Sequence, residues 1–360
     1  LEFSNHDNNW HVRWILRECG IPLIGPAPDA LLPPIPSAEL FREMQESMAK
    51  ILKYFEESID QSRNFFNSQF GQPFVVLTTC RILHTLHIGE VRSKKAGAAW
   101  AKEHLSPKWA ILIKQSWQDR EGVRFGVKIG QRAERKALTE TLAFMQYAMQ
   151  EINKKIVQEG YEKVSHAYRA DALDPSDENY QKYKIWIDEL AQYLPKCTAV
   201  LDLGCGNGIP STQLLTKRYQ VTGVDISSVQ IERANRLVSA AKFICADMST
   251  VTFPAASFDA VVSFYAIIHL PLEEQLPLLK KIHTWLKEDG YLMLVTGHDA
   301  WTGEESNWLD VEGGDMFWSH TDRDTYLKWI TQAGFNVKWN RFIPEGESGH
   351  TLIFAKKGRA

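Results

Sequence analysis

A glycine-rich loop between two short apolar segments places the strongest limit on how this chain can fold. The apolar run Ala199–Leu203, which carries one acid at Asp202, leads directly into this loop. The loop consists of Gly204, Cys205, Gly206, Asn207 and Gly208. Glycines at alternate positions permit positive φ angles and leave no Cβ in the way of a ligand that lies against the backbone. The pattern therefore predicts a buried strand that ends in a tight turn.

The residues after the loop complete one strand–helix–strand unit. The pattern predicts a helix over Ser211–Arg218 and a second strand over Tyr219–Val224, which ends in Asp225. A carboxylate about 20 residues beyond the glycines is where nucleotide-binding α/β folds accept hydrogen bonds from both ribose hydroxyls. The dinucleotide pattern G-x-G-x-x-G needs a third glycine where Ile209 or Ser211 stands, so the spacing disfavours NAD.

This stretch closely resembles motif I of the class I S-adenosylmethionine (SAM) methyltransferases, D-x-G-x-G-x-G, with the acid at the end of the second strand as the next landmark. The resemblance implies that the three glycines admit the methionine part of SAM and that Asp225 binds the ribose. Asp247-Met248, after a predicted strand at Lys242–Ala246, resembles the landmark that binds adenine. The expected cofactor residues are Asp202, Gly204, Cys205, Gly206, Asn207, Gly208, Asp225, Ile226, Asp247, Met248, Phe264 and Tyr168.

Strands and helices continue to alternate beyond Asp225. Strands are expected at Lys242–Ala246, Phe258–Phe264 and Tyr291–Val295, with a closing pair at Phe335–Phe342 and Thr351–Lys356. Helices are expected at Ser227–Ala241, Leu272–Leu286 and Thr321–Ala333, and a turn at Glu288–Gly290. The fold class predicted is α/β, a Rossmann-like seven-stranded SAM methyltransferase domain over residues 159–360, preceded by an all-α helical domain over residues 1–158.

Two segments are expected on the side of the methyl acceptor. His269 follows the strand that ends at Phe264, and its imidazole suits either a general base or an orienting or packing role. The Trp-rich segment Gly297–His320 interrupts the alternation, and such a long segment indicates a lid or substrate surface, or else a cover for the sheet edge. The expected substrate residues are Tyr265, His298, Trp301 and His320, with His269 as the candidate catalytic residue.

The first half of the chain is predicted to be all α. Six prolines within Ile21–Pro36 predict an extended segment rather than a helix. The helices expected after it are Ser37–Phe55, Phe74–Ile88, Lys94–Leu105, Pro107–Trp117 and Arg132–Val157.

Spaced matches in this half resemble the C-terminal helical domain of aminoglycoside adenylyltransferases of the streptomycin/spectinomycin type. They include Val75–Leu83, His87–Val91 and Ser93–Ala96. The resemblance implies that Lys94 and Trp117 lie near ATP in an assembled enzyme, whereas by composition they read as a solvated lysine and a core aromatic. That family holds magnesium with carboxylates after a Gly-Ser loop in a preceding domain. This sequence contains no Gly-Ser dipeptide, so we expect no nucleotidyl transfer by this chain alone.

Composition narrows the function further. The formal charge of −3, from 41 basic and 44 acidic residues, indicates neither a nucleic-acid nor a membrane partner. Five scattered cysteines without a C-x-x-C pair favour reduced thiols in the cytoplasm and disfavour a metal site. The sequence begins with Leu1 rather than Met, which leaves an upstream segment open.

The function expected is therefore SAM-dependent methyl transfer to a small-molecule substrate. Two alternatives stay open at this point, namely a non-catalytic module that binds SAM or a drug, and an aminoglycoside nucleotidyltransferase completed by another chain. The acceptor and the oligomeric state are not determined by the sequence.

Overall fold

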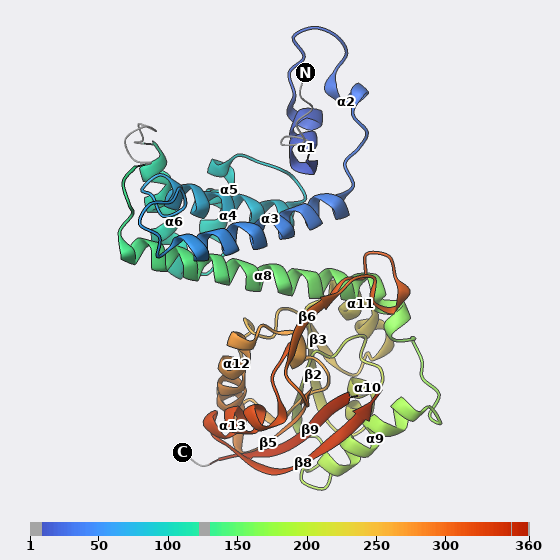
Figure 1. Cartoon of the computed structure of the whole chain (residues 1–360). Coiled ribbons are helices and arrows are strands. Elements are labelled where there is room, and N and C mark those ends of the chain that lie inside the picture. The colour runs from blue at the N-terminus through green and yellow to red at the C-terminus, as the bar shows by residue number, and fades with distance from the viewer. Residues whose placement is uncertain (1–8, 122–129, 347, 359–360) are drawn as a thin grey trace. The chain divides into compact units, whose positions relative to one another are not determined.

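The computed structural model describes residues 9–121, 130–346 and 348–358 (Figure 1). The chain divides into two compact units, Leu1–Ile152 and Asn153–Ala360. This division falls within the long helix α8 (Arg135–Tyr168). The boundary expected from the sequence, between residues 158 and 159, lies further along the same helix and stays a prediction.

Helices dominate the described part of the N-terminal unit. In chain order before α8 they are α1 (Trp10–Cys19), α2 (Pro28–Leu31), α3 (Ser37–Ser58), α4 (Gly71–Ile88), α5 (Lys94–His104), the 3₁₀ helix η1 (Pro107–Trp109) and α6 (Ala110–Glu121). The proline-rich segment Ile21–Pro36 was expected to be extended throughout, but it contains the short helix α2. A helix can begin at Pro28 because the first helical residue needs no N–H partner.

Helix α4 forms the centre of the N-terminal unit. Its side chains are buried on every face, including Val75, Leu77 and Leu83, which are fully buried. Gly97 of α5 lies against it, and a Cβ at that position would be 2.8 Å from the Cα of Arg81. The absence of a side chain at Gly97 therefore allows α4 and α5 to pack closely.

The C-terminal unit is built on a seven-stranded sheet, as the sequence predicts, and its strand order is β3-β2-β1-β4-β5-β9-β8. Its strands are β1 (Ala199–Leu203), β2 (Gln220–Asp225), β3 (Lys242–Cys245), β4 (Phe258–Ser263), β5 (Leu286–Gly297), β8 (Phe335–Glu345) and β9 (Ser348–Lys357). The first five are parallel, and β9 is antiparallel to both of its neighbours. The carboxyl ends of β1, β2 and β4 therefore meet at one edge of the sheet.

Helices cover both faces of this sheet (Figure 1). They are α9 (Glu178–Leu190), α10 (Ser211–Thr216), α11 (Ser228–Leu237), η2 (Ile267–His269), α12 (Leu272–Trp285) and α13 (Arg323–Gln332). Leu279 and Ile282 of α12 and Ile330 of α13 belong to one buried apolar cluster, and Trp186 of α9 and Leu215 of α10 to another. Two packed faces explain why β1 and β4 read as continuous apolar runs.

The Trp-rich segment is not an irregular loop. It forms an antiparallel hairpin of β6 (Trp301–Glu305) and β7 (Met316–His320), joined through the 3₁₀ helix η3 (Trp308–Asp310). The residues Glu288–Gly290, expected to form a turn before the strand, belong to β5 itself, and Asp289 has a φ of 63° within it.

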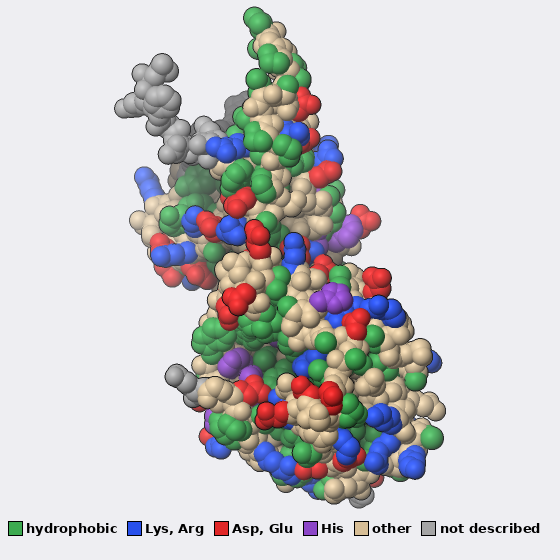
Figure 2. Space-filling model, turned by 90° about the vertical axis from the view of Figure 1, so that its right-hand side faces the viewer, with side chains coloured by type: hydrophobic (Ala, Val, Ile, Leu, Met, Phe, Trp, Pro, Cys, Tyr) green, Lys and Arg blue, Asp and Glu red, His purple; other side chains and the backbone are tan. Residues whose placement is uncertain are grey.

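The molecular surface carries charges of both signs. On the face drawn in Figure 2, basic and acidic side chains are interspersed. Within the described residues, every helix is too short or too polar to cross a bilayer.

Candidate functional site

The glycine loop leads from β1 to α10, and its glycines have different local roles. Gly204, Gly206 and Gly208 all have positive φ, at 75°, 55° and 81°. A Cβ at Gly204 would lie 2.0 Å from the Cβ of Ala266, whereas one at Gly206 would meet no atom within 4 Å. Gly204 thus permits the loop to pack against the turn after β4, and Gly206 leaves open space of the kind a ligand can fill.

Asp225, at the end of β2, is bound to this loop. Its Oδ2 accepts a hydrogen bond of 2.9 Å from the Gly206 N–H, and its Oδ1 accepts one of 2.9 Å from the Ser227 N–H. The residue is only 9% exposed. Burial raises the pKa of its carboxyl, although the backbone N–H groups act in the opposite direction.

Asp225 lines a narrow cavity beneath the loop, here called the loop cavity. Most of the residues expected to bind the cofactor line it, namely Gly204, Gly206, Asp225, Ile226, Asp247, Met248, Phe264 and Tyr168. The space beside Gly206, together with two carboxylates on the wall, fits a ligand with hydroxyl and amino donors.

The other residues expected in the cofactor site shape the loop instead. Asp202 is buried, and its Oδ2 accepts from the hydroxyls of Ser211 and Thr212 at 2.8 and 2.7 Å, which ties β1 to the start of α10. Burial raises the pKa of Asp202 to about 6. The Asn207 amide donates to the Ala170 carbonyl at 3.1 Å. Cys205 and Gly208 are also absent from the walls described for either cavity of this unit.

A buried lysine lies at the Asp247 end of the loop cavity. Lys154, from α8, is 6% exposed, and its Nζ is 3.0 Å from Asp247 Oδ2 and 3.1 Å from Glu274 Oε1. The sequence gives no signal for this residue, because the helical spacing of Lys154 does not distinguish it from the surface lysines of the same helix.

A second cavity of about 800 Å³, here called the large cavity, adjoins the first. Four side chains, Tyr161, Tyr168, Tyr265 and His269, line both cavities. Trp308, from the hairpin, lies with its ring centroid 6.0 Å from that of Tyr161 and 5.4 Å from that of Tyr168. The two cavities therefore meet at a wall of aromatic rings.

His269 is held in one tautomer within this wall. Its Nδ1 is 2.8 Å from the Phe317 carbonyl oxygen, so Nδ1 carries the proton, and its Nε2, 2.9 Å from the Tyr161 hydroxyl, accepts. Burial lowers the pKa of His269 to about 4. The imidazole is therefore neutral at pH 7.

The Tyr265 hydroxyl points toward Glu345, which lines the large cavity but not the loop cavity. Tyr265 has a φ of 59°, unusual for a bulky residue, and its hydroxyl donates to Glu345 Oε1 at 2.6 Å. The Lys182 Nζ lies 3.1 Å from the same Glu345 oxygen and 3.1 Å from the Tyr265 hydroxyl.

The structure does not bring the remaining predicted substrate residues to either cavity wall. His298 Nδ1 lies 3.0 Å from Thr351 Oγ1, and His320 Nδ1 lies 2.7 Å from the Asp299 carbonyl oxygen. Trp301 is 48% exposed and packs on Trp318. The hairpin residues that line the large cavity are Trp308 and Trp318. The Trp-rich composition signalled the segment, but not which of its rings face inward.

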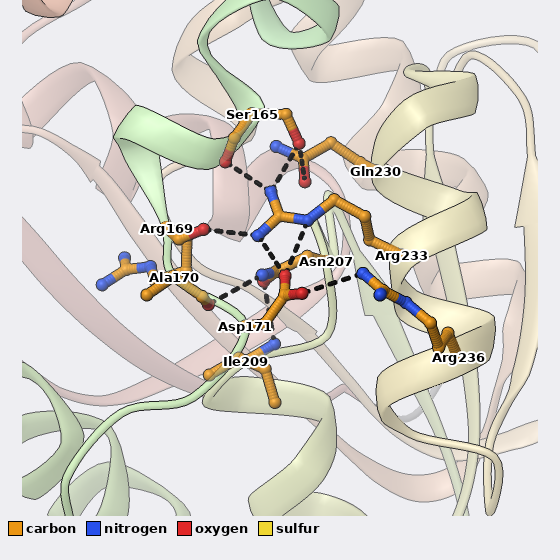
Figure 3. A network of polar contacts seen from close by, with 9 residues as sticks. All are labelled: Ser165, Arg169, Ala170, Asp171, Asn207, Ile209, Gln230, Arg233 and Arg236. Atoms are coloured by element: carbon orange, nitrogen blue, oxygen red, sulfur yellow. Dashed lines mark hydrogen bonds and ion pairs between the residues drawn. The ribbon is translucent and has the colours of Figure 1, made fainter.

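The chain segment after α8 is fixed by a polar network (Figure 3). Arg233 of α11 is 4% exposed, and its guanidinium donates to the carbonyls of Ser165 and Arg169 and to the Asp171 carboxylate. Asp171 also accepts from Arg236 at 2.8 Å. This network holds the backbone just after Tyr168, and nothing in the spacing of these residues predicted it.

In the N-terminal unit, Lys94 lies with its Nζ 3.2 Å from the centroid of the Phe74 ring. Burial, followed by the charges of Arg81 and Arg120, lowers its pKa to about 7. Lys94 is thus not the solvated residue that composition suggested. Trp117 is half-buried.

Two family models match the chain, one in each half. A methyltransferase domain matches residues 200–290, and the C-terminal domain of aminoglycoside adenylyltransferases matches residues 30–148. Both resemblances drawn from the sequence are thereby confirmed. The methyltransferase match includes the glycine loop, Asp225, Asp247 and His269.

Curated methyltransferases match about a third of the chain or less. Phosphoethanolamine N-methyltransferase of Plasmodium falciparum is 35% identical over 116 residues, 31% of this chain and 42% of the relative. The 2-methyl-6-phytyl-1,4-hydroquinone methyltransferase of Synechocystis is 39% identical over 107 residues, 28% of this chain and 33% of the relative. The chain thus spans less than half the length of these relatives.

Solved structures of methyltransferases are also similar to part of the chain. One is the 1,6-didemethyltoxoflavin-N1-methyltransferase of Burkholderia thailandensis, 16% identical with a TM-score of 0.45, over 58% of this chain and 91% of that one. Another is the magnesium protoporphyrin IX methyltransferase of Synechocystis, 17% identical with a TM-score of 0.44, over 57% of this chain and all (100%) of that one.

Proposed function

We propose that the C-terminal unit binds SAM in the loop cavity and transfers its methyl group to a small molecule in the large cavity. The observation that carries the proposal is the shared wall of Tyr161, Tyr168, Tyr265 and His269, at which the two cavities meet. The methyltransferase match over residues 200–290 supports the cofactor, and relatives named for phosphoethanolamine and a hydroquinone support a small acceptor.

The residues of the loop cavity fit SAM. The Asp225 carboxylate has lone pairs beyond the two used by Gly206 and Ser227, and these would accept from the ribose hydroxyls. Asp247 and Met248 would lie at the adenine, with Lys154 holding the Asp247 carboxylate in place. Gly206 would admit the methionine part.

When bound, SAM supplies a methyl group already activated on a sulfonium, so the transfer depends mainly on in-line placement of a nucleophile. Tyr161 and Tyr168 are placed to keep water from the junction of the cavities. Both belong to the last turns of α8, which the Arg233 network holds.

His269 is better suited to orient Tyr161 than to act as the base. Its lowered pKa makes it a weak proton acceptor near neutral pH, and its Nε2 lone pair already receives the Tyr161 hydroxyl. A proton lost by the acceptor would reach this nitrogen only by way of that hydroxyl.

The test combines cofactor binding with turnover. Calorimetry should show SAM binding, and Asp225→Ala should weaken it by about ten- to a hundred-fold, because charged hydrogen bonds are worth roughly 1.5–3 kcal/mol. Asp324→Ala, an exposed acid on α13, is the matched control and should leave the affinity unchanged. Labelled SAM should then transfer its methyl group to at least one compound in a panel of aminoglycosides, amines and phenols, with and without a carboxylate or phosphate group.

Unchanged SAM affinity in a folded Asp225→Ala variant would remove the cofactor assignment. SAM binding without turnover on any compound would favour a non-catalytic binding module.

A further inference from the structure

The side chain of Arg169 lines the large cavity and has no carboxylate partner among the described residues. Its guanidinium carbon lies 5.1 Å from the centroid of the Tyr168 ring and 5.9 Å from that of Tyr183. Among the residues that the structure describes, none offers Arg169 a carboxylate oxygen at ion-pair distance, whereas Lys182 in the same cavity pairs with Glu345 at 3.1 Å. Because a guanidinium stays protonated, the positive charge of Arg169 is permanent.

The backbone of Arg169 is fixed so that its side chain points away from the network around Arg233. Its carbonyl accepts from Arg233 Nη2 at 2.6 Å, and the next carbonyl, of Ala170, accepts from the Asn207 amide. In Figure 3 the Arg169 guanidinium lies on the opposite side of the backbone from these contacts. The same side chain lines the large cavity.

The acidic residues of the cavity do not balance this charge. Glu345 is occupied by Lys182, by the Tyr265 hydroxyl at 2.6 Å and by His350 Nδ1 at 3.0 Å. Glu178 also lines the cavity, but it is exposed in the first turn of α9, where water and salt screen its charge.

We propose, on the basis of the proposed function, that the methyl acceptor carries an anionic group, a carboxylate or a phosphate, which Arg169 binds. A guanidinium can offer two parallel N–H donors to the oxygens of either group. The rings of Tyr183, Trp186 and Tyr265 continue from Arg169 along the wall of the large cavity. The centroid of the Tyr183 ring lies 5.2 Å from that of Trp186 and 6.4 Å from that of Tyr265. Because Tyr265 also lines the loop cavity, a flat apolar body lying on these rings would reach the junction where the methyl group is transferred.

Three small probes test this assignment without knowledge of the acceptor. Benzoate, phenyl phosphate and benzamide share one ring, and only the first two are anionic. We expect at least one anion to bind about ten-fold or more tightly than benzamide at low ionic strength, measured by the fluorescence of the tryptophans that line the cavity. The stronger of the two anions identifies carboxylate or phosphate as the group recognised.

Arg169→Gln should abolish the preference for anions and leave benzamide binding unchanged, whereas Arg169→Lys should keep part of it. Arg323→Gln, which removes an exposed arginine of α13, should change neither. Thermal melting checks that each variant is folded.

Equal affinity of the wild-type chain for all three probes, or no measurable binding of any, overturns the inference. So does a folded Arg169→Gln variant that keeps the preference. A variant that keeps the preference but binds SAM ten-fold more weakly would assign Arg169 to the methionine carboxylate instead. The probe titrations need no cofactor, so a wild-type chain that fails to bind SAM defeats the proposed function separately.

Discussion

The loop cavity and the large cavity are built from the chain in different ways. Gly204, Asp225 and Phe264 of the loop cavity directly follow or end neighbouring parallel strands, so the sheet itself assembles them. The large cavity takes its walls from the end of α8, from α9, from the hairpin and from β8 and β9. A site at strand ends is therefore specified by short motifs, whereas a site between packed side chains depends on how distant segments meet.

The largest expected effect concerns a glycine of the loop. Gly204→Ala should lower the free energy of unfolding by about 2–6 kcal/mol, because a positive φ and a Cβ 2.0 Å from that of Ala266 each cost roughly 1–3 kcal/mol. Gly206→Ala has the strained φ without the clash, so it should cost only about 1–2 kcal/mol while weakening SAM binding. Urea unfolding of both variants measures the difference. Equal losses would mean that the loop cavity is not fixed by backbone packing.

The free energy of unfolding should fall by about 3 kcal/mol as Asp202 loses its proton with rising pH. Its folded pKa of about 6 lies above the unfolded value of roughly 3.9, so the folded state binds more protons between these values and stability falls as pH rises through them. In the Asp202→Asn variant this fall in stability with rising pH should disappear. The measurement is the difference in unfolding free energy between wild type and variant at pH 4 and at pH 7. Parallel profiles would show that Asp202 does not titrate in this window.

The smallest effect tests the walls of the large cavity. Trp308→Ala should raise the acceptor KM about two- to ten-fold, since an aromatic contact is worth roughly 0.5–1.5 kcal/mol beyond the area it buries. Trp301→Ala should change it less than about two-fold, because Trp301 is half-exposed and outside the cavity wall. Steady-state kinetics with an acceptor from the labelled-SAM panel decide this. A larger effect at Trp301 would restore the original expectation from the sequence.

The sequence predicted the sheet and much of the loop cavity because both depend on local patterns. Short apolar runs predicted β1, β2 and β4, and the acids after the second and third strands predicted the positions of Asp225 and Asp247. The same reasoning placed Asp202 in the cavity, although its side chain turns toward Ser211 and Thr212. A motif identifies residues that the fold requires, but it does not separate those that bind a ligand from those that support the loop.

The large cavity was predicted only in outline, for a physical reason. Trp301 and Trp318 both lie in the segment that was expected at the acceptor, but the inward face of the hairpin depends on the register Gly303↔Trp318, which is set by tertiary packing. Lys182, Glu345 and Arg169 come from three separate segments, and no spacing along the chain relates them.

The position of β9 has a consequence for how the unit forms during synthesis. Residues 348–357 pair with β5 on one side and β8 on the other, so the strand made last in this sheet is an interior strand. Until the ribosome has released it, the edge of β5 that pairs with β9 stays open. This edge covers the seven residues Tyr291–Gly297, five of which are apolar. The nascent chain therefore exposes an aggregation-prone strand during the translation of about 60 further residues, and at roughly 5–20 residues per second this lasts for seconds.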